Sequence, residues 1–507
     1  MAEHYDLVII GAGPGGYTAA EAAVQLGMRT AIIEKDKIGG AFINTGCVPA
    51  KALLQAVSVY SDVKRSEMFG VTKEGVGFDL RMMMDYKDRK VQEVRRLEQK
   101  RLIGSGVTYI HGTAKLHRNN QVEIDTAEGV KYVIGDNVII ASGAMPRVLR
   151  VPGIYLPQAM NSRAILNATE WHYDRLVVVG GGVIGVECAT IFRTLGSEVT
   201  LLERSSRLLD TLDEAVSDKM KENLEEKGVR VLCGVSVKGF VEVDPSVNNG
   251  PVEVHYMDGG EEKSVECDRV LVSCGRESRV KTVLGDDCTV KFDQDGHPII
   301  DRSFQTTQKG VYLIGDCISR QRLAHVATSQ AVYVVEHIAK KGHRMQMTVV
   351  PNGMYVVLPI VPVCIFTDPE VATVGFTEAE AATYNMKVIV GRRELKENRK
   401  AILADSSNGF IKLIFEAYTH TLVGAQIICP RAADMIGELA TAIANGLTEH
   451  QLHTAMRAQP TYSEAINAAI DDVYRQSEEL KEEKNSYEYI GFGADPLASG
   501  EDEGAEY

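Results

Sequence analysis

Residues 7–16 read LVIIGAGPGG, and this stretch decides the fold. Its four leading apolar residues predict a buried strand, and glycines at positions 11, 13 and 16 then follow the spacing GxGxxG. A helical run comes next, and a second apolar strand, residues 31–33, ends in Glu34. The glycines allow a tight turn and a close backbone approach to a pyrophosphate, and the helix N-terminus faces that anion. The acidic residue accepts a hydrogen bond from a ribose hydroxyl, so the stretch predicts a dinucleotide-binding unit.

The same local pattern returns later in the chain. Residues 176–185 read LVVVGGGVIG, a helical run follows, and the strand at residues 199–202 ends in Glu203. A single GxGxxG motif is weak evidence. Two copies, each between strands and each with an acidic residue about 20 positions further on, are strong. The chain therefore predicts two strand-helix-strand units that bind dinucleotides.

Length and charge limit the classes of protein that fit. The 507 residues are enough for about three domains, and 45% hydrophobic and 24% charged residues are ordinary for a water-exposed globular chain. A net charge of -14 disfavours a nucleic-acid or anionic-membrane partner, because both require basic surfaces. The longest apolar run, residues 354–366, is too short to span a bilayer and contains two prolines. We expect no nucleic-acid partner and no transmembrane segment.

The cysteines indicate a reducing compartment. Their number is odd, their spacing is scattered, and no CxxC pair occurs, which is typical neither of a disulfide framework nor of a zinc site. The chain also enters its first strand almost at once, which leaves no room for a signal peptide. We expect a cytoplasmic protein without a structural metal. The nine cysteines are Cys47, Cys188, Cys233, Cys267, Cys274, Cys288, Cys317, Cys364 and Cys429.

Residues 39–51, GGAFINTGCVPAK, closely resemble the redox-active segment of the flavoprotein disulfide reductases, the family of dihydrolipoamide dehydrogenase, glutathione reductase and mercuric reductase. Four further segments resemble motifs of that family in the same order along the chain, so the resemblance extends from about residue 4 to about residue 470. These segments are ASGAMPR at 141–147, VYLIGD at 311–316, LAHVA at 323–327 and FTDPEVA at 366–372.

The resemblance implies an α/β protein with two Rossmann-like dinucleotide-binding domains and a C-terminal α+β dimerisation domain. Residues 1–150 and 280–348 would form a discontinuous FAD-binding domain, and residues 151–279 the NAD(P)-binding domain. Residues 349–472 would form the dimer interface of a homodimer. Residues 473–507 are rich in Glu, Asp and Gly near their end, which predicts an acidic, flexible tail.

The resemblance also assigns the cofactor-binding residues. Glu203 favours NADH, because a carboxylate accepts from a free 2′-hydroxyl and repels a 2′-phosphate. Arg204 and Arg207 follow it and leave NADP(H) open. Asp316 would bind the ribityl chain of FAD. The residues implied for FAD are Gly11, Gly13, Pro14, Gly16, Glu34, Gly40, Ala41, Ser142, Gly143, Asp316 and Ala324. Those implied for NAD are Gly180, Gly182, Val183, Ile184, Gly185, Glu203 and Gly275.

The redox-active segment departs from the family at one position. In the family two cysteines five positions apart cycle between dithiol and disulfide. Cys47 matches the second of them, whereas Phe42 stands where the first belongs, and a phenyl ring cannot exchange sulfur. Lys51 and Glu187 match a family ion pair beside the flavin, where they would keep a positive charge close to the ring that receives the hydride.

A second departure lies near the C-terminus. The family completes its active site from the other subunit with a His-Pro-Thr-x-x-Glu motif, and here residues 458–464 read AQPTYSE. Gln459 replaces the histidine, and an amide takes up no proton at neutral pH, so acid-base catalysis through this position is lost. Glu464, which would orient that histidine, is retained. Both departures fall on the dithiol half-reaction.

These observations favour an FAD-dependent NAD(P)H oxidoreductase that passes electrons to a small non-disulfide acceptor such as a quinone. One alternative is a single-cysteine disulfide or persulfide reductase that uses Cys47, and another is a dihydrolipoamide dehydrogenase-like redox subunit or sensor without catalysis. The family's carboxylating lyase branch ranks lower, because it keeps both cysteines. Cys47 itself is either a flavin-facing thiolate or an inert packing residue.

Overall fold

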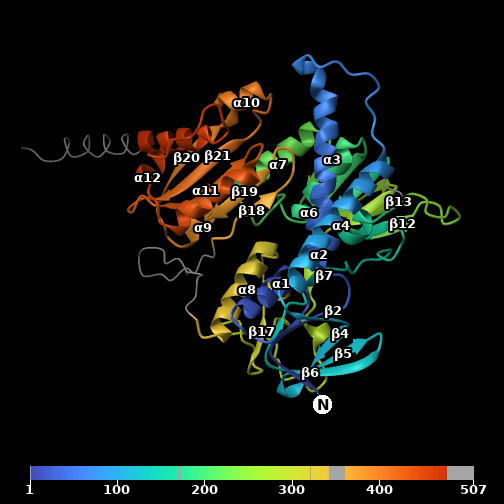
Figure 1. The fold of residues 1–507 in the computed structure, drawn as a ribbon. Helices are drawn as coiled ribbons and strands as arrows, with labels where there is room; N and C mark the ends of the chain where they lie inside the picture. Colours follow the sequence, from blue (N-terminus) through green and yellow to red (C-terminus); the bar gives the residue numbers. More distant parts are fainter. Residues whose placement is uncertain (1, 169–172, 320, 342–359, 477–507) are drawn as a thin grey trace, which may run out of the picture. The chain divides into compact units, whose positions relative to one another are not determined.

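The computed structural model describes residues 2–168, 173–319, 321–341 and 360–476 (Figure 1). The chain divides into two compact units, residues 1–372 and 373–507, and each is described by itself. Most of the predicted acidic tail, from residue 477 onward, lies outside the described residues. Residues 473–476 of that tail continue a helix that begins at residue 464.

The first sheet of unit 1 is mostly parallel and has the order β3-β2-β1-β6-β5-β4, and β17 pairs with the last residues of β6, beyond those that pair with β5. β4 and β5 run antiparallel at one edge. Because β17 comes late in the chain, two separate stretches of sequence build this sheet. Its strands are β1 (Glu3–Ile10), β2 (Thr30–Glu34), β3 (Thr108–His111), β4 (Thr113–Leu116), β5 (Gln121–Thr126), β6 (Gly129–Ile140) and β17 (Val311–Leu313).

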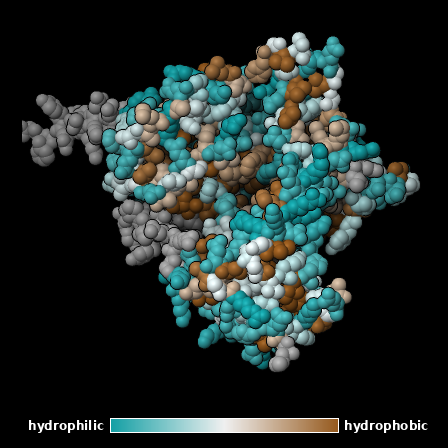
Figure 2. Space-filling model, in the orientation of Figure 1, coloured by the Kyte–Doolittle hydropathy of each residue, from teal (hydrophilic) through white to brown (hydrophobic). Residues whose placement is uncertain are grey.

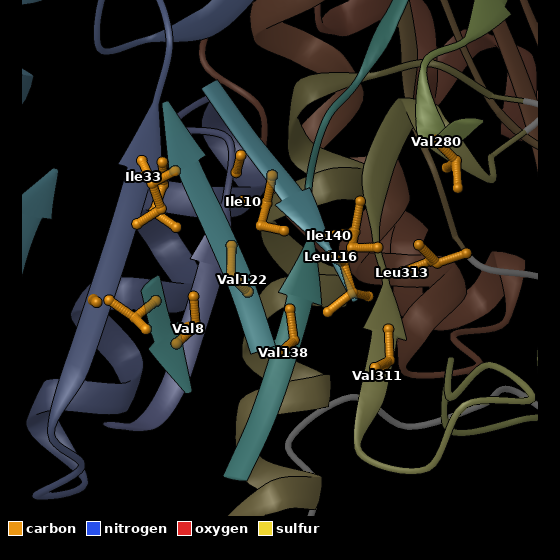
Figure 3. Packing of buried hydrophobic residues seen from close by; sticks show 14 of the residues in the cluster. Val8, Ile10, Ile33, Leu116, Val122, Val138, Ile140, Val280, Val311 and Leu313 are labelled. Carbon is orange, nitrogen blue, oxygen red and sulfur yellow. The ribbon is translucent and has the colours of Figure 1, made fainter. Parts of the chain in front are cut away.

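The sheet is buried on both faces around its central strand β1. On β1, Val8 and Ile10 join a hydrophobic cluster with residues of β6 and β17, as Figure 3 shows. The alternate residues Leu7 and Ile9 join a second cluster on the other face, where α1 (Pro14–Gln25) and α8 (Ala324–Ile338) pack. Burial on two faces explains why residues 7–10 are apolar without the alternation of a half-exposed strand.

The second parallel sheet of unit 1 repeats this arrangement with the strand order β11-β10-β9-β15-β8. An antiparallel sheet of β12, β13 and β14 shares a hydrophobic cluster with it, and β16 pairs with β7 in a small separate sheet. The strands are β7 (Ala144–Pro146), β8 (Ala159–Asn161), β9 (Arg175–Val179), β10 (Glu198–Glu203), β11 (Arg230–Cys233), β12 (Ser236–Glu242), β13 (Val252–Asp258), β14 (Glu261–Cys267), β15 (Arg269–Val272) and β16 (Arg276–Ser278).

The two glycine loops have matching geometry. A Cβ atom on Gly16 would lie 1.8 Å from the carbonyl oxygen of Gly11, and one on Gly185 would lie 1.9 Å from that of Gly180. Only glycine fits such a close approach of helix to turn. The second glycine loop leads into α6 (Val183–Thr194), as the first leads into α1. The prediction of two strand-helix-strand units is therefore confirmed.

The segment between β2 and β3 is mostly helical. The charged segment of residues 81–102 lies in a single helix, α4, which Asp79 caps by accepting from the backbone N–H of Met82 at 3.0 Å. The remaining helices of unit 1 are α2 (Gly40–Asn44), α3 (Cys47–Arg65), η1 (Ser66–Phe69), α4 (Leu80–Gly104), η2 (Arg118–Asn120), α5 (Ser162–Leu166), α7 (Glu214–Glu226), η3 (Val280–Val283) and η4 (Gly315–Cys317).

Unit 2 contains an antiparallel sheet in which β22 and β20 flank β21, and β21 and β22 are buried along their whole length. Helix α11 packs against β22. The short strand β18 (Val363–Ile365) precedes it, and the division between the units falls within β19. The elements are β19 (Val371–Gly375), α9 (Glu378–Thr383), β20 (Val388–Glu394), η5 (Leu395–Glu397), α10 (Arg399–Leu403), β21 (Phe410–Glu416), β22 (Leu422–Ile428), α11 (Ala432–Ala444) and α12 (Glu449–His453).

Hydrophilic residues, interspersed with smaller hydrophobic areas, cover the face drawn in Figure 2. Among the described helices, none combines the length and the apolar character that a membrane crossing requires.

Candidate functional site

The residues predicted for FAD lie at the carboxyl ends of the parallel strands of the first sheet. The glycine loop follows β1, Ser142 and Gly143 follow β6, and Asp316 follows β17, all at the carboxyl ends of neighbouring parallel strands. Ligands of such sheets bind outside the carboxyl ends of the strands. Gly40 and Ala41 begin α2, and Ala324 begins α8.

Each glycine loop is held by the acidic residue that the sequence analysis assigned to a ribose. The carboxylate of Glu34 accepts hydrogen bonds from the backbone N–H groups of Ala12, at 2.8 Å, and Asp36, at 2.9 Å. The carboxylate of Glu203 accepts from Gly181 and Ser205, both at 2.6 Å. Both carboxylates are therefore fixed in the same orientation relative to their loops.

The carboxyl ends of the strands of the first sheet have the features that FAD requires. Helix α1 starts after Gly13 with Pro14 in its first turn and has no acidic residue there, so its N-terminus attracts an anion. A Cβ atom on Gly40 would lie 2.8 Å from the Cα atom of Gly13, so two backbones meet closely beside the loop. The Oγ atom of Ser142 is buried and has no hydrogen-bond partner among the described residues. The cradle and the unsatisfied hydroxyl fit the pyrophosphate and ribityl parts of FAD.

The carboxyl ends of the strands of the second parallel sheet fit NAD(H). Helix α6 begins at Val183 after Gly182, again without an acidic residue in its first turn. Gly275 follows β15, and its carbonyl accepts from the backbone N–H of Arg147 at 3.0 Å. Arg207 donates to backbone carbonyls of residues 210 and 212 in its own loop, at 3.2 and 3.4 Å, which engages it away from a 2′-phosphate.

Lys51 and Glu187 form the ion pair that the sequence predicted. The Nζ atom of Lys51 lies 2.8 Å from each carboxylate oxygen of Glu187, and the N–H of Phe366 donates to the same carboxylate at 3.0 Å. The side chain of Glu187 is only 6% exposed, so the pair is largely removed from water. The ammonium also lies 4.7 Å from the ring centroid of Phe366, which fixes its position further.

Cys47 is the first residue of α3, and its residue surface is exposed. The thiol of Cys47 is free. Protein atoms still surround the thiol closely, so desolvation raises its pKa, while Lys51 acts in the opposite direction and Glu187 adds to the increase. Desolvation is the largest of these effects, so the raised pKa counts against a thiolate at neutral pH.

Unit 2 contains the two predicted residues near the C-terminus and a partner that the sequence analysis missed. Arg399 donates to Glu464 at 3.1 Å and lies 3.4 Å from the amide oxygen of Gln459. Glu464 also accepts from the backbone N–H of Thr461 at 2.8 Å. Arg399 lies 60 positions before Gln459, at the start of α10, and no local motif marked it.

Family comparisons agree with this geometry. A family model described as pyridine nucleotide-disulphide oxidoreductase matches residues 5–331, and a model of that family's dimerisation domain matches residues 361–470. The chain belongs to the pyridine nucleotide-disulphide oxidoreductases, a family of FAD- and NAD(P)-dependent flavoproteins. The predicted family, α/β fold class and cofactors are thereby confirmed.

Similar proteins carry the names of flavoprotein reductases. The dihydrolipoyl dehydrogenase of Staphylococcus aureus is 34% identical over 467 residues, covering 92% of this chain and 96% of that protein. The mitochondrial dihydrolipoyl dehydrogenase of Pisum sativum is 34% identical over 474 residues, covering 92% and 91%.

Two solved structures share the fold. A Cu(II) complex of the HOCl-induced flavoprotein disulfide reductase RclA from Escherichia coli has a TM-score of 0.80 at 24% identity, covering 93% of this chain and 99% of that chain. LpdA from Mycobacterium tuberculosis has a TM-score of 0.81 at 23% identity, with the same coverage of 93% and 99%.

Proposed function

We propose that this chain is an FAD-dependent NAD(P)H oxidoreductase whose electron acceptor is a small molecule without a disulfide, with a quinone as the first choice. FAD, when bound at the first sheet, would supply hydride and electron transfer between the nicotinamide dinucleotide and the acceptor. Glu203 favours NADH as the donor. The odd number and the scattered spacing of the nine cysteines favour a reducing, cytoplasmic compartment, and the dimerisation domain favours a homodimer.

The observation that carries the proposal is the identity of the residues at positions 42 and 459, which in the family serve sulfur exchange. Position 42 holds a phenylalanine in α2, so Cys47 has no thiol partner five positions before it. Glu464 binds the guanidinium of Arg399, next to an amide at position 459. Neither position supplies a nucleophilic sulfur or a base that titrates near neutral pH.

The ion pair that the resemblance places beside the flavin is present. The ammonium of Lys51 is fixed by Glu187, and the carboxylate of Glu187 is fixed in turn by the N–H of Phe366. A cation held in place before the reaction stabilises negative charge that develops beside it without reorganising. Phe42 also places a large apolar ring where the family has a thiol, and this favours a flat, hydrophobic acceptor.

A single-cysteine sulfur reductase is the second candidate, because Cys47 matches the second redox cysteine of the family and its thiol is free. The raised pKa of the thiol makes it the weaker candidate, since the thiolate is the nucleophile. A redox subunit or sensor without turnover is the third, and only kinetics separates it from an enzyme.

Anaerobic addition of NADH to the purified yellow protein separates these candidates. We expect rapid bleaching of the flavin absorbance, turnover with a benzoquinone or ferricyanide, and no turnover with lipoamide. A Cys47→Ser variant should keep the quinone activity. Lipoamide reduction that this variant abolishes would overturn the proposal, and turnover only with a disulfide or polysulfide would favour the second candidate. Absence of bleaching would favour the third.

A further inference from the structure

An open cavity of about 500 Å³ lies on unit 1, and no residue of either glycine loop lines it. Its volume is within the range of pockets that take small molecules. The lining residues come from the turn after β2, the end of α2, the middle of α4 and the segment around α5. None of them belongs to the sets that the sequence analysis assigned to FAD or to NAD. The cavity is therefore a separate feature of the chain.

The lining of this cavity is basic, although the whole chain has a net charge of -14. Lys37, Arg95 and Arg163 are cations, and Asp36 is the only carboxylate among the lining residues. Three cations with one carboxylate leave an excess of two positive charges. The other polar lining side chains are amides and one hydroxyl, which hydrogen-bond without adding charge. Such a lining attracts an anion.

Contacts with neighbouring side chains hold the two arginines at the cavity. The guanidinium of Arg95, on α4, donates to the amide oxygen of Asn44 at 3.2 Å. Asn44 is fixed in turn, because its own amide donates to three backbone carbonyls of the turn before it. Arg163, on α5, lies 3.6 Å from the carboxylate of Asp36, and both of these side chains are exposed. A guanidinium has five N–H donors, so each arginine keeps donors for a ligand.

The cavity lies between the two dinucleotide-binding units, both of which belong to unit 1. Asp36 comes just after β2 of the first sheet. Helix α5 follows β8 of the second parallel sheet and contacts β15 of the same sheet. Asn44 and Thr45 belong to the redox-active segment, between Phe42 and Cys47. A ligand in the cavity would therefore contact the redox-active segment and the second dinucleotide-binding unit together.

We propose that this cavity binds a phosphorylated small molecule through Arg95 and Arg163. Guanidinium groups form charge-assisted, often bidentate hydrogen bonds to phosphate oxygens, and the ammonium of Lys37 adds a point charge. A phosphate ester carries about two negative charges at neutral pH, which offsets the excess positive charge of the lining. The amides and the hydroxyl of the lining suit the hydroxyl groups of a sugar. The site is separate from those of the electron donor and acceptor, and it holds whichever acceptor the enzyme uses.

Calorimetric titration tests this binding without reference to turnover. The protein would be loaded with FAD and saturated with NAD⁺, so that neither dinucleotide site is open to the probe. The probe is fructose 1,6-bisphosphate, and we expect a Kd below about 1 mM. Fructose, which lacks the phosphates, should not bind. Citrate is the third titrant, and citrate binding tighter than that of the bisphosphate would overturn the assignment to a phosphate.

Substitutions of both signs locate the binding. Arg95→Met, Arg163→Met and the double variant would be compared with Arg96→Met, which removes the same charge from an exposed neighbour on α4 that does not line the cavity. We expect the double variant to bind the bisphosphate about tenfold more weakly or worse. Asp36→Asn removes the one carboxylate of the lining and should strengthen binding by about twofold or more. General damage to the fold would not produce a gain.

Three results would overturn the proposal. The first is no heat of binding for the bisphosphate up to about 10 mM. The second is an affinity of the double variant within about twofold of the Arg96→Met control. The third is weaker binding by Asp36→Asn. Circular dichroism and the flavin retained per protomer check that each variant folds. If Arg95→Met does not fold, because it loses the contact with Asn44, Arg163→Met and Asp36→Asn decide.

Discussion

Arg399 donates a hydrogen bond to Glu464 at 3.1 Å, so the glutamate that would orient a histidine is paired here with a permanent cation. The side chain of Glu464 is 12% exposed, whereas that of Arg399 is 70% exposed. The guanidinium therefore presents its positive charge to the surroundings next to the neutral amide of Gln459. At this place the family has a histidine that exchanges protons, whereas here Gln459 carries no charge and the neighbouring Arg399 is a cation.

This pairing predicts a flat pH dependence of acceptor reduction. The amide of Gln459 carries no group that titrates near neutral pH, so kcat/KM for the acceptor should vary little between about pH 6 and 9. A Gln459→His variant should introduce a limb with an apparent pKa of about 6 to 7. Steady-state rates with benzoquinone over this pH range measure both. A strong titration of the native enzyme that Gln459→His leaves unchanged would point to a different proton donor.

Restoring the two altered positions should restore sulfur chemistry. The double variant Phe42→Cys/Gln459→His regains both the missing thiol and the missing base, and we expect measurable reduction of NAD⁺ by dihydrolipoamide. Each single variant lacks one of the two groups and should show little activity. The control is the triple variant that also carries Cys47→Ser, which should again be inactive. Activity in the triple variant would show that the pair at positions 42 and 47 is not responsible.

Loss of Lys51 should destabilise the protein. Lys51→Met leaves the buried carboxylate of Glu187 with only the N–H of Phe366, and we expect a loss of about 1–3 kcal/mol in the free energy of unfolding. Lys51→Met/Glu187→Gln should lose less than the sum of the single changes, because it leaves no unpaired charge. Denaturant unfolding of the three variants measures this coupling. Strict additivity would mean that the pair contributes no interaction energy.

The raised pKa of Cys47 predicts slow alkylation near neutral pH. In protein freed of flavin, iodoacetamide should modify Cys47 slowly at pH 7 and faster only above the ordinary thiol range, because the thiolate is the reactive form. Lys51→Met removes a cation that lowers this pKa, so the rate at pH 8 should fall further. Peptide mass spectrometry distinguishes this site from Cys188, Cys267 and Cys317, whose pKa values are raised to about 12 by burial. Rapid labelling at pH 7 would indicate a thiolate and revive the sulfur-reductase alternative.

The two glycine loops should fail separately. Gly16→Ala places a methyl group 1.8 Å from the carbonyl oxygen of Gly11, and we expect protein with little or no bound flavin. Gly185→Ala creates the same clash with Gly180, at 1.9 Å, and should leave a yellow protein that NADH bleaches poorly. Flavin absorbance and the rate of NADH-dependent bleaching report the two outcomes. The opposite assignment of losses would reverse the roles of the two units.

The sequence predicts the parts of this protein in which local pattern fixes local structure. The glycine loops, the acidic residues at positions 34 and 203, and the strands before them all follow from spacing, because a turn, a helix start and a buried strand leave their signature within a few residues. The start of helix α4 is a local signal of the same kind, because Asp79 accepts from the backbone N–H of Met82 at the first turn.

The contacts that the sequence did not predict join distant segments. Arg399 reaches Glu464 across 65 positions, and Arg322 reaches Arg276 across 46, and neither separation has a periodic signature. The Lys51–Glu187 contact, 136 positions apart, was foreseen only because both residues lie within recognised motifs. The pKa of Cys47 depends on how closely other segments surround it, so a favourable neighbour such as Lys51 did not reveal its direction.

The carboxylate of Glu203 accepts from two backbone amides of its own turn, at residues 181 and 205. Replacing it to admit a phosphorylated ribose would also remove the anchor that shapes the turn. A substitution at Glu203 that changes coenzyme preference would therefore make the turn less rigid, unless a second substitution supplied a new acceptor for the N–H groups of residues 181 and 205. Under the proposed role of Glu203 in binding the ribose, coenzyme preference and the shape of this turn depend on the same carboxylate, and Glu34 anchors the first glycine loop by the same two kinds of hydrogen bond.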